Sequence, residues 1–276
     1  MRKLFCLALL TSLILFVMNP LLAEEKERRP MTTDDSLNMV SISSVLMSPD
    51  GEWIFFSKSE LDWEKNKRKT KYYKISAQGG EDFQFISEAG GSSFRFSPDG
   101  KFLSFKRIVE KVSQIFLMPT SGGEGVQYSK HKNSVGSYKW SPDSKKIFFI
   151  AKKQRTKEEE KKYKAGEDVI LVDEGPNGQI ASQWQNLWVF DIETKKETRI
   201  TEEEMLIRDF DVSPCGKKIA FSARFSNRRN EGYKSELYLV NIEDKKKVRL
   251  TNNNAPESSV TWAPDGKSFS YMASDD

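Results

Sequence analysis

The side chains that could carry catalysis are few in this sequence. It has one histidine, His131, and two cysteines, Cys6 and Cys215, in 276 residues. A histidine-based metal site needs several further ligands, and none cluster near His131 in the sequence. A structural zinc site needs paired cysteines, which the spacing does not offer. The sequence therefore predicts no metal and no cofactor.

Nucleophilic hydrolysis needs an activated serine, most recognisably on a G-x-S-x-G turn followed by Asp and His. That motif is absent; GGSSF at 90–94 lacks its final glycine, and we expect it in an inter-strand loop. DEGPNG at 173–178 has some likeness to a calcium loop, but its spacing fails and no closing glutamate follows. We therefore predict no catalytic, cofactor-binding or metal-binding residue, and the substrate-binding residues stay unknown.

Phosphate and nucleic-acid binding are not favoured either. The pairs Gly79–Gly80 and Gly122–Gly123 occupy equivalent turns and do not open a helix, as a phosphate-cradling loop would. Lys, Arg, Asp and Glu are intermixed rather than arranged as a basic stripe with stacking aromatics. We expect no nucleic-acid partner.

A repeated motif organises the rest of the chain. Five near-copies occur: MSPDGEWIFF (47–56), FSPDGKFLSF (96–105), WSPDSKKIFF (140–149), VSPCGKKIAF (212–221) and WAPDGKSFSY (262–271). Pro presets φ, Asp bonds nearby backbone N–H groups, and Gly accepts a left-handed conformation, so each copy predicts a tight turn between antiparallel strands. Cys215 replaces the Asp of one turn, and we assign it no function.

The repeat spacing indicates the architecture. The prolines stand at 49, 98, 142, 214 and 264, and a period near 40–50 residues with β-type sequence is typical of propeller blades. Each hairpin is followed by a second β-rich pair, as in 72–87, 115–129, 186–201 and 236–251. We predict an all-β fold, a β-propeller of four-stranded blades with about four and a half blades present, forming an incomplete ring.

The third blade carries an insertion. The 72-residue spacing between Pro142 and Pro214 exceeds the others, and the excess lies at about 152–184. Its first part, 152–168, is highly charged and rich in helix formers, while 169–184 reads as a short strand, a turn and a return. The insertion is either a solvated excursion or a gate or partner-contact element projecting from the ring.

The N-terminus reads as an export signal. A basic start at Arg2 and Lys3, an apolar run from Leu4 to Met18, and Ala23 before Glu24 predict a signal peptide over 1–23, cleaved after Ala23. An uncleaved anchor is the alternative. Residues 24–35 are then a linker and 36–276 the partial propeller, with localisation periplasmic or extracellular. Cleavage lowers the formal net charge from +4 to +2, and we expect no membrane contact beyond the signal segment.

The SPDG-plus-β repeat resembles the propellers of S9 (prolyl oligopeptidase family) serine peptidases and TolB-type periplasmic propellers. EEEKKYKAGEDVILVDE (158–174), leading to NLWVFDIETKKETRIT (186–201), looks like the blade-three insertion of dipeptidyl-peptidase or acylaminoacyl-peptidase relatives; LMPTSGGE (117–124) is similar to their blade-closing turn. The resemblance implies a propeller that precedes an α/β-hydrolase domain and restricts its substrates to peptides. This chain ends at Asp276 within the propeller pattern, so no catalytic residue is carried over.

Three readings follow. The first is the non-catalytic, substrate-gating propeller portion of an exported S9-type peptidase, present as a fragment or truncated product, which meets a peptide substrate only together with a hydrolase domain. The second is a TolB-like periplasmic module that binds a protein partner. The third is a propeller enzyme or lectin that acts on carbohydrate, disfavoured by the single histidine. Whether the chain is part of an enzyme stays open at this point.

Overall fold

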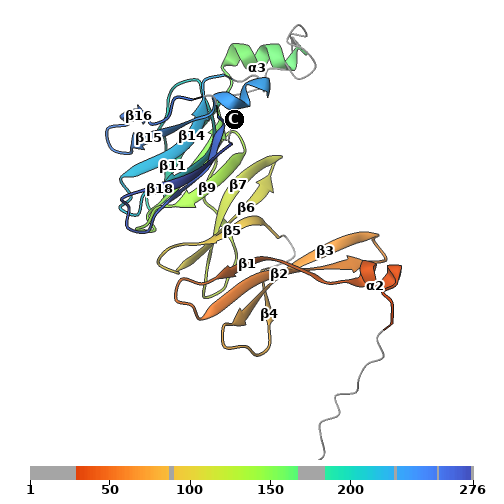
Figure 1. Ribbon diagram of the computed structural model, residues 1–276. Coiled ribbons are helices and arrows are strands. Elements are labelled where there is room, and N and C mark those ends of the chain that lie inside the picture. Colours follow the sequence, from red (N-terminus) through yellow and green to blue (C-terminus); the bar gives the residue numbers. More distant parts are fainter. Residues whose placement is uncertain (1–28, 87–89, 167–183, 227–228, 254, 275–276) are drawn as a thin grey trace, which may run out of the picture.

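The computed structural model describes residues 29–86, 90–166, 184–226, 229–253 and 255–274. Its strands form four-stranded antiparallel units that follow one another in chain order (Figure 1). The first unit contains β1 (Ser41–Met47), β2 (Trp53–Asp62), β3 (Lys67–Ser76) and β4 (Phe83–Ile86). The second contains β5 (Ser92–Phe96), β6 (Phe102–Val109), β7 (Val112–Pro119) and β8 (Val126–Gln127).

The later units repeat this order. The third comprises β9 (Val135–Trp140), β10 (Lys146–Lys152), β11 (Gln185–Asp191) and β12 (Glu197–Arg199). The fourth comprises β13 (Leu206–Val212), β14 (Lys218–Arg224), β15 (Glu236–Asn241) and β16 (Lys247–Arg249); a final hairpin joins β17 (Glu257–Trp262) and β18 (Phe269–Ala273). Four blades and a two-stranded half-blade are thus present, which confirms the predicted β-propeller. A single parallel pair, Gln185 with Leu206, joins the third and fourth blades into one sheet.

The repeated motif turns the chain between the first two strands of each unit, as predicted. In the second blade the Ser97 hydroxyl donates to Asp99 at 2.6 Å and accepts from the Phe102 N–H at 2.9 Å, and Gly100 has φ +71°. Ser141 and Asp143 repeat these bonds in the third blade. The serine hydroxyl holds the pKa of Asp99 and of Asp143 below the usual range. The motif is therefore a self-contained hydrogen-bonded turn.

The fourth blade lacks this carboxylate, which gives a first prediction. The Ser213 hydroxyl still accepts the Lys218 N–H at 3.0 Å, but in place of a carboxylate it meets the Cys215 thiol, at 3.4 Å. Replacing Cys215 by Asp should restore the charge-assisted bond and raise the melting temperature by about 2 °C at pH 7. A carboxylate whose pKa is lower in the folded state than in the unfolded state stabilises the fold at pH above the unfolded-state pKa. This stabilisation is lost as the pH falls through the folded-state pKa, so the gain in melting temperature should disappear in acid.

Differential scanning calorimetry of the wild type and the Cys215→Asp variant at pH 7 and pH 3 measures this gain. Cys215→Ala is the control, because it removes the thiol without supplying a carboxylate. An equal rise in melting temperature for both variants would show that the serine–carboxylate bond is not the cause.

A second repeated device fastens the fourth strand of a blade to the third. In the third blade Arg199 donates to the Thr201 carbonyl at 2.6 Å and to Asn186 Oδ1 at 2.9 Å. The Thr201 hydroxyl in turn accepts the Leu187 N–H at 3.1 Å. Equivalent bonds are made in the fourth blade by Arg249, Thr251, Glu236 and Leu237, and in the second by Gln127, Ser129, Gln114 and Ile115. We call this arrangement the fourth-strand anchor.

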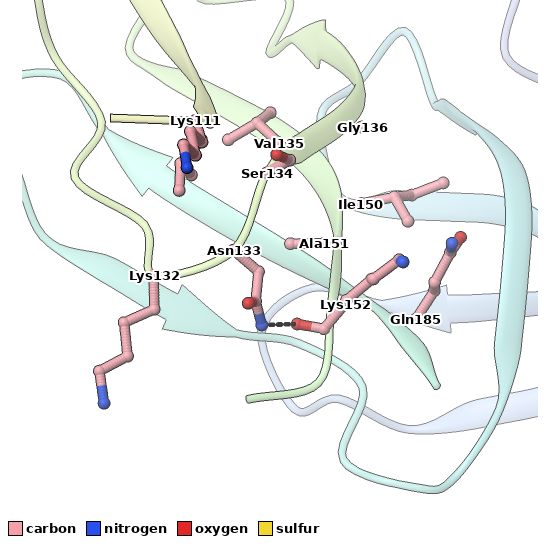
Figure 2. A pocket seen from close by; sticks show the side chains of 11 residues that line it. Lys111, Lys132, Asn133, Ser134, Val135, Gly136, Ile150, Ala151, Lys152 and Gln185 are labelled. Atoms are coloured by element: carbon pink, nitrogen blue, oxygen red, sulfur yellow. Dashed lines mark hydrogen bonds between the residues drawn. The ribbon is translucent and has the colours of Figure 1, made fainter. Parts of the chain in front are cut away.

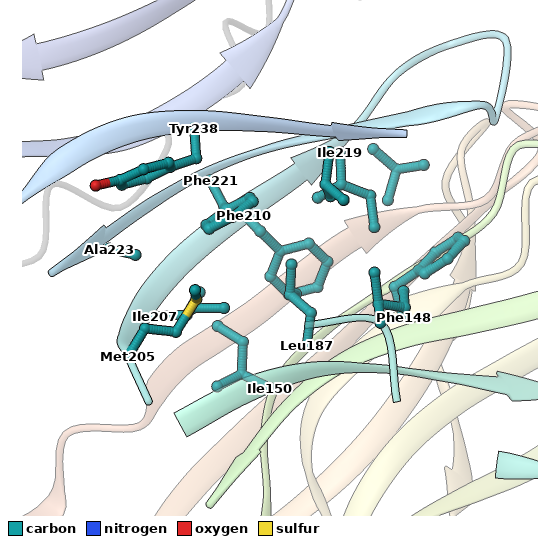
Figure 3. Close-up of a cluster of buried hydrophobic side chains, with 13 residues drawn as sticks. Phe148, Ile150, Leu187, Met205, Ile207, Phe210, Ile219, Phe221, Ala223 and Tyr238 are labelled. Atoms are coloured by element: carbon teal, nitrogen blue, oxygen red, sulfur yellow. The ribbon is translucent and has the colours of Figure 1, made fainter. Parts of the chain in front are cut away.

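The hydrophobic core lies between successive blades. Figure 3 shows the cluster between the third and fourth, where Phe148, Leu187 and Phe221 are at most 1% exposed. Two further clusters occupy the equivalent places at the earlier blade boundaries, and a smaller one holds Val260 of the half-blade against Ala220 and Leu237. Apolar contact between sheets is therefore what keeps the blades together.

Hydrogen bonds between the second and third blades add to this packing. Ser104 accepts the Trp140 indole N–H at 2.8 Å and lies 3.0 Å from the Tyr138 hydroxyl, which donates to the Ser93 carbonyl at 2.6 Å. Burial raises the pKa of Tyr138, so the phenol stays protonated. Buried polar groups satisfied in this way fix the register of neighbouring blades.

Two helices flank the sheets. α2 (Thr33–Asn38) begins with a capping box formed by Thr32 and Asp35, and covers the end of the predicted linker 24–35. α3 (Lys157–Lys164) lies in the first part of the insertion, where the charged stretch 152–168 is rich in helix-forming residues. The predicted strand and return at 169–184, apart from Trp184, and the predicted signal peptide at 1–23 lie outside the described residues. Within the described ranges no helix has the length and apolar character to cross a membrane.

Candidate functional site

A cavity of about 410 Å³ lies where the insertion leaves the third blade (Figure 2). Lys152 at the end of β10 and Gln185 at the start of β11 both line it, so the two ends of the insertion meet at its wall. The second blade contributes the β6–β7 turn. The full lining is Lys111, Val112, Lys132, Asn133, Ser134, Val135, Gly136, Ile150, Ala151, Lys152 and Gln185.

The lining is positively charged. It contains Lys111, Lys132 and Lys152 and no acidic side chain. A second cavity of about 410 Å³ shares Lys132 and Asn133 and extends the surface along the insertion, adding Arg155, Lys157 and one acid, Glu160. We call the two together the rim site.

Local structure places each part of the rim site. Lys111 lies in a two-residue hairpin turn in which both it and Glu110 have positive φ, 68° and 49°, the geometry that matches strand twist. The Asn133 amide donates to the carbonyls of Lys152 and Lys153 at 3.1 and 3.2 Å, tying the β8–β9 connection to β10. A Cβ at position 136 would lie 3.0 Å from the Ile150 carbonyl oxygen, so glycine allows β9 and β10 to approach closely here.

The chemistry that this arrangement supports is binding. Ammonium groups around an opening attract carboxylates and other anions and raise their local concentration. Across the described residues no group of three or more His, Cys, Asp or Glu side chains gathers to hold a metal. The arrangement can therefore orient a ligand, and no covalent step is assigned to it.

His131 is a buried structural residue. Its side chain is 1% exposed, its Nδ1 lies 2.9 Å from Glu197 Oε2, and its ring meets Trp188 edge-on with centroids 4.7 Å apart. A histidine oriented by a carboxylate supplies two of the three members of a catalytic triad. Its Nε2, however, is buried without a hydrogen-bonding partner, so no nucleophile completes the set.

The other candidate stretches fall in different places. GGSSF was expected in an inter-strand loop; Gly90 and Gly91 do lie outside the strands, but the expectation is wrong for Ser92 to Phe94, which begin β5, where Ser93 takes φ +56° at a bulge. A bulge inserts an extra residue and so interrupts the alternation that marks a strand in the sequence. Cys215 is an exposed thiol in its turn. DEGPNG at 173–178 lies outside the described residues.

Sequence reasoning missed the rim site. Lys111, Lys132 and Lys152 belong to three separate segments, and each is an ordinary surface lysine in the sequence. The one local indication is SKHKN at 129–133, where two lysines flank the histidine just before β9.

Comparison with known proteins gives the context for this fold. No family model matches the chain. An uncharacterised peptidase, YuxL of Bacillus subtilis, is 23% identical over 223 residues, which cover 77% of this chain and 34% of YuxL. The chain therefore spans about a third of the length of this relative.

Solved structures agree on the fold. A TolB protein of Agrobacterium tumefaciens superposes with a TM-score of 0.55 at 20% identity, over 86% of this chain and 71% of TolB. An acylaminoacyl peptidase of Pyrococcus horikoshii gives 0.53 at 19% identity, over 78% of this chain and 33% of the peptidase. The chain is thus a β-propeller. Its relatives are S9-family peptidases and TolB-like propellers, and it matches the propeller portion of those peptidases.

Proposed function

We propose that this chain is the non-catalytic, substrate-gating propeller portion of an exported S9-type serine peptidase that acts on peptides. The observation that carries the proposal is the rim site, because the two ends of the blade-three insertion, Lys152 and Gln185, line the same basic cavity. Helix α3, the described start of the insertion, contributes Lys157 and Glu160 to the second cavity of the rim site. This contact supports a role for the insertion in screening what approaches the positively charged surface.

The charges suit a peptide substrate. A peptide carries a terminal carboxylate and often acidic side chains, which Lys111, Lys132 and Lys152 attract over several ångströms. Hydrolysis itself is assigned to a separate α/β-hydrolase domain. Purified residues 24–276 should therefore release no product from aminoacyl or dipeptidyl chromogenic substrates. Turnover that a serine-directed inhibitor abolishes would refute this division of labour.

Reading the gene beyond the codon for Asp276 is the most direct test. A frame that continues to G-x-S-x-G and later Asp and His supports the peptidase proposal; a genuine stop contradicts it. Export is part of the same proposal, and mass spectrometry of the mature protein from the cell envelope should give Glu24 as the first residue. An N-terminus at Met1 would instead support an uncleaved anchor.

Shortening the insertion gives a prediction about selectivity. The Lys153 N–H donates to the Trp184 carbonyl at 2.6 Å, so the chain ends on either side of 154–183 are adjacent and a four-residue Gly/Ser turn can join them. In the complete peptidase this deletion should raise kcat/KM for long peptides several-fold, because a gate acts on access rather than on chemistry. Steady-state kinetics over a peptide-length series measures it.

A dipeptide chromogenic substrate is the internal control for this deletion. Its kcat/KM should stay within about twofold of the wild-type value, since a small substrate needs no gate opening. An equal change for short and long substrates would show that the insertion supports the catalytic geometry and does not gate.

The alternative is a TolB-like module that binds a protein partner. The fold likeness to the Agrobacterium TolB structure, with a TM-score of 0.55, motivates this alternative. Affinity capture from envelope extracts separates the two proposals: a stable stoichiometric partner that is not a hydrolase supports the module. Its absence leaves the peptidase proposal ahead.

A further inference from the structure

Arg224 is a buried guanidinium without a partner. It ends β14, its side chain belongs to a residue that is 1% exposed, and Nε, Nη1 and Nη2 are all buried with no hydrogen bond. A guanidinium presents five N–H donors in a planar fork. Leaving a charged group buried and unpaired costs several kcal/mol, so such a site calls for a compensating anion.

Other arginines in the described chain show the usual arrangement. Arg199 donates to two carbonyl oxygens and to Asn186, and Arg249 donates to the Thr251 carbonyl and to Glu236. Both complete a fourth-strand anchor. Arg224 belongs to no anchor, and no acceptor for it is found among the residues that the structure describes.

The position of Arg224 leaves its fork directed at the boundary between the fourth blade and the half-blade. Side chains alternate along a strand, so Arg224 shares a face of β14 with Ala220 and Ser222. Ala220 packs on Val260 of β17, and Ser222 donates to Asp209, whose other oxygen accepts the Val260 N–H. Arg224 continues this face toward the start of β17.

The cover over Arg224 comes from η1 (Arg229–Lys234). Gly232 lies above it: a Cβ at this position would be 3.4 Å from Nη1, in van der Waals contact with the fork. The nearest acid in this segment, Glu231, already receives a 2.7 Å bond from Lys234. Burial lowers the pKa of Arg224 and the Arg208 charge adds to this, while Glu231 acts in the opposite direction.

The same end of the fold carries the rim site. Leu206 pairs with Gln185 on one side and with Arg224 on the other, so the cavity wall and the buried guanidinium lie at neighbouring strand ends. Lysines of the rim site would concentrate anions next to Arg224.

We propose that Arg224 is the centre of an oxyanion-binding site beneath the η1 segment. The ligand group is a carboxylate or a phosphate, held by the guanidinium fork through two parallel N–H···O bonds. This site goes beyond the gating proposal and does not depend on any peptidase activity.

Binding is tested on the full chain with succinate, inorganic phosphate and chloride at matched ionic strength. We expect succinate or phosphate to raise the melting temperature by several degrees and chloride to leave it unchanged, and the better of the two identifies the geometry of the group. The Arg Nε–Hε NMR resonance of Arg224 should shift with the same apparent Kd. A wild-type protein that responds to none of these oxyanions overturns the proposal.

Three variants assign the effect to Arg224. Arg224→Met should fold, because removing an unpaired buried charge is neutral or stabilising, and should lose at least tenfold in oxyanion affinity. Gly232→Val fills the space over the fork and should weaken binding while the charge remains. Lys218→Gln, at the exposed opposite end of β14, is the matched control and should keep affinity within about threefold. Full retention of binding by Arg224→Met overturns the proposal and leaves a buried water as the partner.

Discussion

Replacing Phe221 by Ala is expected to lower the free energy of unfolding by about 3–5 kcal/mol, because the ring is fully buried and its loss leaves a cavity. Phe221 lies in the cluster between the third and fourth blades and stacks on Tyr238 with ring centroids 5.5 Å apart. A loss of this size is comparable with the whole stability of many domains. The variant should therefore show little cooperative transition above room temperature.

Phe225→Ala is the matched control for this substitution. It removes the same side chain four residues away, where Phe225 is 50% exposed and contacts the edge of Tyr238. Urea denaturation followed by tryptophan fluorescence compares the two variants with the wild type. Equal destabilisation by both would show that the boundary between the third and fourth blades is not the dominant core.

The second large effect concerns the fourth-strand anchor of the third blade. Asn186 is fully buried, donates to Thr201 Oγ1 at 3.2 Å and the Glu203 carbonyl at 2.9 Å, and accepts from Arg199. Asn186→Leu removes all three bonds; Arg199 keeps its bonds to the Thr201 and Glu202 carbonyls, but its guanidinium loses the Asn186 acceptor. We expect a loss of about 3 kcal/mol in the free energy of unfolding.

A double-mutant cycle separates this bond network from simple misfit of leucine. Adding Arg199→Met removes the guanidinium that has lost its Asn186 acceptor. The double variant should therefore lose less free energy of unfolding than the sum of the two single variants, by at least about 1 kcal/mol. The exposed Asn252→Leu serves as the control and should change stability little. Strict additivity of Asn186→Leu and Arg199→Met would contradict the proposed coupling.

Much of the architecture follows from local chemistry in the sequence. The Ser-Pro-Asp-Gly turns form from bonds within six residues, as Ser97, Asp99 and Phe102 show, so a short pattern suffices to predict each hairpin. The Arg and Thr of the fourth-strand anchors stand in TRIT and VRLT at 198–201 and 248–251, at the ends of the β-rich pairs predicted at 186–201 and 236–251. Their partners, Asn186 and Glu236, stand 13 residues upstream of Arg199 and Arg249, and only the strand register brings them together.

The functional surfaces were less predictable because they depend on contacts between blades. Lys111 lies in the β6–β7 turn, Lys132 lies in the β8–β9 connection, and Gln185 follows a long insertion. Arg224 reads as an ordinary surface residue, since arginine is almost never fully buried without a partner. Its environment is set by η1 and β17, and nothing in the sequence shows that these two segments pack over the end of β14.

The backbone pairing of Gln185 with Leu206 bears on how the fold tolerates change. Each blade has its own ladder of strands, so a blade is a unit that duplication can add or remove whole. Backbone bonds also cross between blades: the Gln185 N–H donates to the Met205 carbonyl at 2.9 Å beside the Gln185–Leu206 pair, and the Glu257 N–H donates to the Ser235 carbonyl at 3.1 Å. The first of these bonds fixes the start of β11 to the fourth blade, so new loop sequence can be added before Gln185 while the strand keeps its place.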